Sequence, residues 1–283
     1  MQPRHFTILP ILLAVGYILV KTLFSPTFTN PETGTKHHVG MNDQQEQSLG
    51  LQAYQQVLQK EGANVISSGP EVEMVRRVAR RLAAATAEKS QANYNWQLSV
   101  IKSDQVNAFC LPGGEIVVYT GIIPVANGEA GLATVMGHEM AHATSRHGAI
   151  RMARQEKIQI LEQGAMGSLQ NMDYQQQQIA MQAIGAVGQY GGVMPFSREQ
   201  ESEADHIGLL YMARAGYDPQ QALDFWKRMD EQTSRGAPPA FLSDHPSNGQ
   251  RVQQLQGWMP EAEKEFANSK MKDTKQPTQQ TGM

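Results

Sequence analysis

The sequence predicts an α+β protein that is mostly helical and has a small antiparallel sheet beside the helix that carries its chemistry. Three observations predict this class. Apolar residues recur at spacings of three and four over most of the chain, and alternation with a period of two is confined to residues 96–119. The sequence HEMAH, an HExxH pattern, follows at 138–142 on a segment rich in small residues.

The chain begins with an apolar segment. Residues 6–20 carry no charge, and Leu23 and Phe24 extend the run. Its length lies between the core of a signal peptide, about 7–15 residues, and a spanning helix, about 20. We expect residues 1–24 to be an uncleaved signal anchor in a bacterial inner membrane, with the rest of the chain in the periplasm. A cleaved signal peptide, which would leave a periplasmic protein, is the alternative.

The remaining composition sets the domain boundaries. Residues 25–42 are rich in Pro, Thr, Gly and Asn, which predicts a linker in which His37 and His38 form a solvated pair. One domain is expected over 43–267, and a disordered tail over 268–283, which has almost no large apolar residues. The 24 basic and 27 acidic residues give a net charge of −3, which gives no reason to expect nucleic acid as a partner.

The elements follow in order. Helices are expected from Asp43 to Gly62 and after Pro70, and then a strand over 96–102. Two short strands should surround the turn at 112–114, and a long helix should run from 129 to Gly148. Residues 150–194 predict helices with a glycine-rich end, either a lid or a plain helical hairpin. Three further helices are expected: one within residues 195–219 that stops at Gly216, one from 220, and one from 250 to about 266.

The HExxH pattern predicts a metal site with its own base. Positions four apart lie on one helix face, so His138 and His142 can bind one Zn²⁺ through two imidazoles. Glu139 is rotated away from both rings and can accept a proton from a metal-bound water. The alternative is that these histidines are surface or core residues of an ordinary helix.

A hydrolytic zinc site needs a third protein ligand and an open position. His147, five positions after His142, would point away on a continuous helix and is expected to have a structural or surface role. Glu201 or Glu203 can supply the ligand, and spacing does not separate them. The alternative is that these glutamates lie on a solvated acidic helix face and bind no metal. Asp205 shares the face of Glu201 and can accept a hydrogen bond from a zinc-bound histidine.

Four segments occur in the order NAFCLPGGEIVVYTGII, HEMAH, SREQESEAD and HPSNGQR. Together, over about residues 42–258, they resemble metallopeptidase family 48, the group of the HtpX heat-shock proteases, the CAAX prenyl proteases and the Oma-like proteases. The resemblance implies a zincin-like fold, one zinc ion per chain and a gluzincin type of site. It assigns the third ligand to Glu201, because the family pattern Glu-x-x-Ala-Asp matches residues 201–205.

The resemblance also implies further roles. Asn107, Ala108 and Phe109 would lie on an edge strand that binds an extended peptide. Cys110 is expected to be a half-buried filler. His245 would approach the metal, either to stabilise the oxyanion or to occupy the open zinc position at rest, and Arg251 would order the acidic groups near the third ligand. The membrane spans and helical repeats of some members are absent, so the chain is most similar to the compact, Oma-like peptidases.

These observations predict a zinc metalloendopeptidase in which His138, His142 and Glu201 bind the metal and Glu139 and His245 act in catalysis. Asp205 and Arg251 would support the ligands from behind. The expected substrates are extended segments of misfolded or damaged envelope proteins. The alternative is a chaperone-like module that binds unfolded envelope proteins with little proteolysis, and a hydrolase of non-peptide bonds is less favoured.

Overall fold

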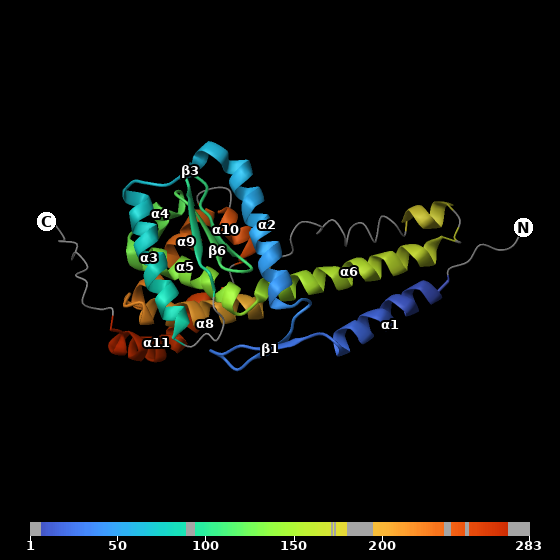
Figure 1. Ribbon diagram of the computed structural model, residues 1–283. Helices are drawn as coiled ribbons and strands as arrows, with labels where there is room; N and C mark the ends of the chain where they lie inside the picture. Colours follow the sequence, from blue (N-terminus) through green and yellow to red (C-terminus); the bar gives the residue numbers. More distant parts are fainter. Residues whose placement is uncertain are drawn as a thin grey trace, which may run out of the picture.

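The computed structural model describes residues 7–88, 94–170, 172, 174–179, 195–234, 239–246 and 249–270. The glycine-rich part of the segment predicted as a lid or a helical hairpin, 180–194, and the part of the predicted tail from 271 onward lie outside these residues. Figure 1 shows a globular body and a long arm of two helices that extends away from it.

A four-stranded sheet forms one layer of the body. Its strand order is β3 (Val65–Ile66), β4 (Gln97–Ile101), β6 (Glu115–Tyr119) and β5 (Ala108–Leu111). The pairs β3–β4 and β5–β6 are antiparallel, whereas β4 and β6 run parallel because β5 crosses to the edge and leaves β6 in the centre. The predicted α+β class with a small sheet is confirmed, and so is the hairpin around the turn at 112–114.

Helix α5 (Glu129–Thr144) is buried in the body, and other helices surround it and cover the sheet. These are α2 (Asp43–Glu61), α3 (Pro70–Ala87), α4 (Ile122–Ala126), α8 (Arg198–Arg214), α9 (Gln220–Ser234), α10 (Ala240–Asp244) and α11 (Arg251–Asn268). Every residue of α5 from Gly131 to Thr144 is buried, so this helix is the centre of the core and not a surface helix with one apolar face. The sheet, α3, α8 and α9 all pack against it.

Helices α5 and α8 touch through their backbones. A Cβ atom added to Gly208 would lie 2.7 Å from the His138 nitrogen, and one added to Gly137 would lie 2.9 Å from the Gly208 oxygen. Glycine at both positions therefore permits the close approach. Because residues seven apart lie on the same face of a helix, the contact also turns Glu201 of α8 toward α5.

The helix that carries HExxH ends earlier than predicted. Helix α5 stops at Thr144, and α6 (His147–Leu169) begins after Arg146, whose φ of 56° is left-handed. The Arg146 guanidinium donates to Glu46 Oε2 at 2.7 Å and to the Met41 oxygen at 3.0 Å, and these bonds hold the turn. The prediction of one helix through Gly148 was wrong, and His147, the first residue after the break, is buried beside His142.

Residues 25–42 are not a free linker. They form a hairpin of β1 (Thr27–Thr29) and β2 (Lys36–His38), and Gly34 adopts a φ of 73° in its turn. Glu32 accepts two hydrogen bonds from Arg214 of α8, at 2.7 and 2.9 Å, and both side chains are at most 2% exposed. The composition typical of a loop therefore forms a tight hairpin that a buried ion pair fixes to the body.

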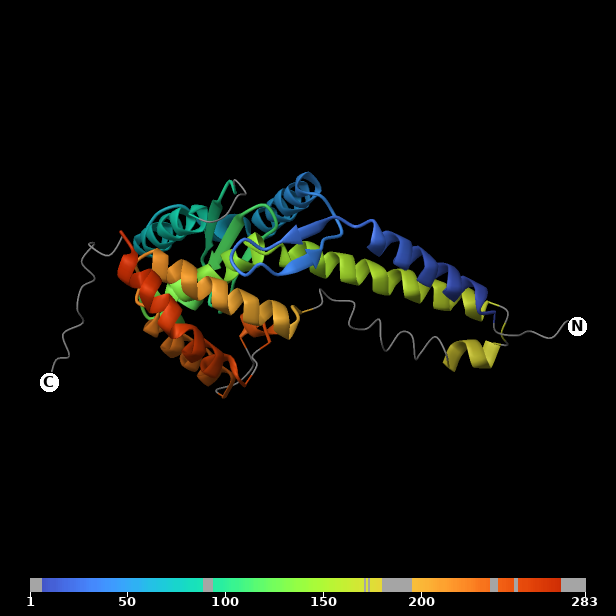
Figure 2. The same ribbon diagram turned by 90° about the horizontal axis from the view of Figure 1, so that it is seen from below.

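The arm consists of α1 (Leu9–Leu23) and α6, which lie side by side in both views (Figures 1 and 2). Gly164 and Gly167 of α6 face Pro10 and Ala14, which lets the two helices approach closely. The outer side of α1 leaves large apolar side chains exposed: Leu9, Leu12, Leu13, Tyr17, Leu19, Val20 and Leu23. Among the residues that the structure describes, no helix combines the length and hydropathy needed to cross a bilayer.

Candidate metal centre

Four side chains from three parts of the chain converge in the core. His138 and His142 come from α5, Glu201 from α8, and His245 from the end of α10, and one possible ligand atom of each lies within 4.8 Å of the others. All four are at most 2% exposed. Spacing alone left Glu201 and Glu203 open as the third ligand and the family pattern assigned Glu201, and the structure brings Glu201 to the histidines.

The distances within this group match a tetrahedral ion. His138 Nε2 lies 3.0 Å from His142 Nε2 and 3.5 Å from Glu201 Oε2, and His142 Nε2 lies 3.3 Å from Glu201 Oε1. Bonds of about 2.0–2.1 Å from one tetrahedral zinc ion would separate its ligand atoms by about 3.3 Å. The observed spacings lie around this value.

The buried environment also favours ligation. Burial keeps the pKa of His142 well below its usual value, so this ring is neutral. His138 Nδ1 lies 2.9 Å from Asp205 Oδ1, without the geometry of a hydrogen bond; the nearby carboxylate oxygen favours a proton on Nδ1 and a lone pair on Nε2. Two lone pairs 3.0 Å apart beside a carboxylate repel one another unless a cation lies between them. The two nitrogens and the carboxylate are a donor set that suits zinc.

Arg251 and Asp205 contact the predicted ligands. Arg251 Nη2 donates to Glu201 Oε2 and Nε to Asp205 Oδ2, both at 2.6 Å, and the guanidinium stacks 3.9 Å from the centre of the Trp226 ring. Burial alone would raise the pKa of Glu201, but the neighbouring His142, His245 and His138 rings outweigh burial and lower it. The Glu201 carboxylate therefore stays ionised in the core.

Glu139 points to the other side of the four converging side chains. Its Oε2 accepts a hydrogen bond of 3.3 Å from the Cys110 N–H of β5. Burial raises the pKa of Glu139, although His245 and His138 oppose this. A carboxylate with a raised pKa is a stronger proton acceptor, as a general base at neutral pH requires.

His245 lies between the predicted ligands and the predicted base. Its Nδ1 is 3.0 Å from Glu201 Oε1 and 3.2 Å from His138 Nε2, and its Nε2 is 3.3 Å from Glu139 Oε1. The ring stacks on Phe241 of α10 at 4.4 Å. It is therefore a fourth donor to the group, and its position is compatible with both roles that the sequence left open.

The predicted peptide-binding segment lies beside this centre. Strand β5 is at the edge of the sheet; Ala108 is buried and Phe109 is half-buried. The Asn107 oxygen accepts from the Tyr119 N–H, so it belongs to the pairing with β6. Cys110 is half-buried, and burial raises the pKa of its thiol well above the usual value, as expected of an unreactive filler. Substrate binding by residues 107–109 remains a prediction.

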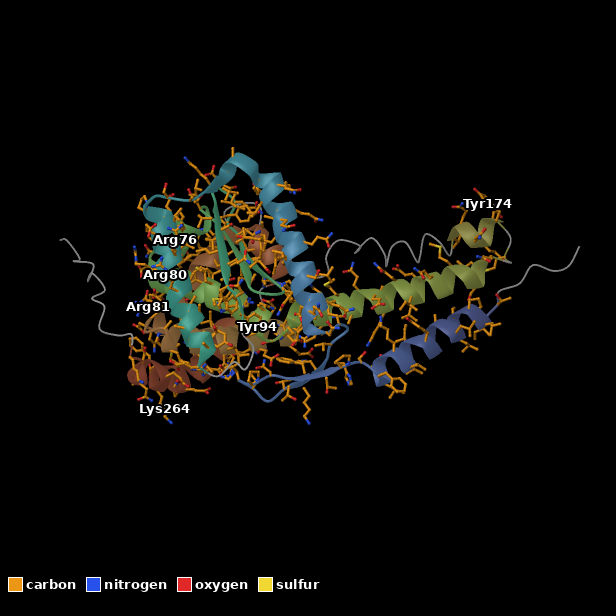
Figure 3. All side chains as sticks on the ribbon, viewed as in Figure 1. Arg76, Arg80, Arg81, Tyr94, Tyr174 and Lys264 are labelled. Carbon is orange, nitrogen blue, oxygen red and sulfur yellow. The ribbon has the colours of Figure 1, made fainter. Side chains whose placement is uncertain are left out.

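Sequence reasoning missed two residues next to the centre. His147 is fully buried, and its Nδ1 lies 3.0 Å from His142 Nδ1. Its Nε2 lies 3.0 Å from Glu203 Oε2. The helix break that turns His147 inward occurs at Arg146, and a left-handed arginine has no sequence signal of the kind that glycine gives. Tyr94, labelled in Figure 3, donates a hydrogen bond of 3.1 Å to the oxygen of Ala143, the residue after His142.

Two histidines and a glutamate on one buried helix, with a carboxylate from a second helix, define a site of the HExxH metallopeptidase class. The family comparison gives the same result. The model of Peptidase family M48 matches residues 71–259, so the chain belongs to this family.

Three relatives illustrate how widely the similarity extends. The mitochondrial metalloendopeptidase OMA1 of Schizosaccharomyces pombe is 36% identical over 220 residues, 77% of this chain and 62% of that protein. OMA1 of Arabidopsis thaliana is 38% identical over 165 residues, 57% of this chain and 31% of that protein. The beta-barrel assembly-enhancing protease of Escherichia coli (strain K12) is 29% identical over 221 residues, 77% of this chain and 44% of that protein. The chain thus spans roughly a third to three fifths of their lengths.

Proposed function

We propose that the protein is a zinc-dependent metalloendopeptidase. The observation that carries this proposal is the convergence of His138, His142 and Glu201 at the separations of a tetrahedral zinc site, with the Glu139 carboxylate beside them. Membership of the family and the names of the relatives, which include metalloendopeptidases, support it.

Some residues of the centre would bind the metal, and another would transfer protons. His138, His142 and Glu201 hold the ion, which when bound supplies a water of lowered pKa and polarises the scissile carbonyl. Glu139 takes the proton of that water and later returns it to the leaving amine. The Cys110 N–H holds one oxygen of Glu139, so the carboxylate stays oriented toward the substrate side of the centre.

Peptide substrates would bind as an added strand. Strand β5 is at the edge of the sheet and contacts α5, the helix that carries the ligands. An extended segment that lies along Asn107, Ala108 and Phe109 can gain main-chain hydrogen bonds at Ala108, whose backbone faces the open edge between two residues that pair with β6, regardless of its side chains. This mode suits a protease that acts on unfolded chains of many sequences.

His245 would regulate access to the centre. Its Nδ1 is as close to Glu201 and His138 as those residues are to each other. We propose that it occupies the fourth zinc position at rest and leaves when a substrate enters, after which it stabilises the oxyanion.

The location follows from the N-terminal segment. The exposed apolar side chains of α1 support attachment of residues 1–24 to a bacterial inner membrane, with the catalytic body in the periplasm. Substrates would then be misfolded or damaged envelope proteins. The relative named beta-barrel assembly-enhancing protease supports a role in the envelope.

The test is the Glu139→Gln variant with zinc bound. Cleavage of casein should fall by about 10²–10⁴-fold, because the proton acceptor is lost, while zinc content stays at one ion per chain. Wild-type cleavage should disappear with a chelator and return with zinc. Cleavage that survives in the variant would overturn the mechanism. A wild-type protein that prevents aggregation of unfolded substrates but never cuts them would indicate a binding module instead.

A further inference from the structure

Glu203 receives four polar contacts that the proposed reaction does not use. Asn30 Nδ2 and Thr33 Oγ1 donate to its Oε1 at 3.0 and 2.7 Å. His37 Nε2 and His147 Nε2 lie 3.1 and 3.0 Å from its Oε2. Three of these partners belong to the hairpin that the sequence predicted as a linker. Both oxygens are therefore saturated, and the side chain is only 9% exposed.

These contacts determine where the protons of two histidines lie. An ionised carboxylate only accepts, so His147 must carry its proton on Nε2 and present a lone pair at Nδ1. That lone pair lies 3.0 Å from His142 Nδ1, which must then be the donor. A neutral His142 with its proton on Nδ1 has its lone pair on Nε2, the atom that faces His138 and Glu201.

We propose that the β1–β2 hairpin is part of the metal centre: with Glu203 it fixes the tautomer of His147, and His147 fixes His142 in the form that binds the ion. The inference rests on the proposed function for the identity of the metal. His147 and Glu203 are positioning residues, because they reach the ion only through His142. Outer partners of this kind typically change metal affinity by 10–100-fold.

The first test compares two substitutions of His147 in the full chain, purified in detergent. His147→Asn keeps an acceptor near the position of Nδ1, whereas His147→Leu fills the space but removes the acceptor. Zinc affinity, measured by competition with a chromogenic chelator, should fall about 10–100-fold in His147→Leu and recover to within a few fold of wild type in His147→Asn. A residue that only packs would give the reverse order, since Asn leaves a cavity, and that result would overturn the proposal.

The second test acts from the hairpin, so it does not depend on how well the His147 variants fold. Thr33→Val removes one hydrogen bond to Glu203, together with two bonds to Thr35 within the turn. Thr29→Val makes the same exchange of residue type at an exposed strand position of the same hairpin. Zinc affinity should fall about fivefold in the former and stay unchanged in the latter. Equal zinc affinities in the two variants would contradict the proposed role of the hairpin in the metal centre.

Stoichiometry and activity separate the remaining outcomes. His37, His147 and Glu203 could themselves hold an ion, so a second zinc per wild-type chain that Glu203→Gln removes would overturn the proposal. Zinc affinity is read without catalysis. A protein that cuts no peptide yet shows these affinity changes would refute the peptidase and keep the inference. An active peptidase whose zinc affinity is the same in all of these variants as in the wild type would refute the inference and keep the proposed peptidase function.

Discussion

The backbone contact between α5 and α8 makes Gly208→Ala a sharp test of how the third ligand is placed. The new Cβ would lie 2.7 Å from the His138 nitrogen and 2.9 Å from the His138 Cα, whereas ordinary contacts begin near 3.4 Å. Both opposing atoms are backbone, so no side chain can rotate away. The two helices must separate by about 0.7 Å at this point.

This separation acts directly on the metal centre. Glu201 lies two turns before Gly208 on the same face of α8, so it moves away from His138 and His142 with the helix. Metal–ligand distances tolerate only about 0.2 Å. We therefore expect zinc affinity to fall by at least about tenfold and peptide cleavage by about 10²-fold, together with an overpacking cost of about 1–3 kcal/mol in the free energy of unfolding.

The assay is chelator competition for zinc, combined with cleavage of a quenched fluorescent peptide and urea unfolding. Gly257→Ala is the matched control, because Gly257 is in helix α11 and its added Cβ would meet nothing within 4 Å. That variant should keep both activities and gain about 0.5–1 kcal/mol of stability. If Gly208→Ala bound zinc and cut peptide like Gly257→Ala, the helix contact would not position Glu201, and the reasoning would fail.

Three further predictions concern charge and metal. Arg251→Leu should lower the free energy of unfolding of the chelated protein by about 3–5 kcal/mol, since Glu201 and Asp205 lose their buried partner; a loss below about 1 kcal/mol in urea would contradict this. Burial would raise the pKa of Glu203, but hydrogen bonds from His147 and Thr33 outweigh it and lower the value to about 2 from 4.5. Its stabilising contribution is complete above pH 4.5 and lost toward pH 2, so the Tm gap between the chelated wild type and Glu203→Gln should close over that window; a constant gap would refute it. Removing zinc should lower the Tm of the wild type, by the equivalent of about 2.7 kcal/mol when free zinc had been at 100 times its Kd, and an unchanged Tm would indicate that no ion binds the folded state.

Much of the centre could be predicted because its residues stand in short patterns. His138 and His142 are four apart on one helix, and helical geometry alone puts both rings on the same face. Glu201 needed the family pattern, since spacing could not separate it from Glu203. The pairing of β5 with β6 followed from the turn at 112–114.

The errors have a common physical origin in contacts between segments distant in the chain. The hairpin at 25–42 is held by the ion pair between its Glu32 and Arg214 of α8. These two residues are more than 180 positions apart in the chain, so no local sequence pattern predicts the pair. The inward position of His147 depends on a left-handed Arg146, which Glu46 stabilises from another helix. Composition and periodicity report local preference, so neither could show these arrangements.

The arm has a geometric consequence for the centre from which it departs. His147 is the first residue of α6, and the 23 residues of that helix make a rod about 34 Å long whose far part packs on α1. Pivoting such a rod by about 3° about His147 swings its tip by roughly 2 Å while the base barely shifts. A displacement of the far end of the arm is thus reduced to a small fraction of its size at His147, the residue that contacts His142.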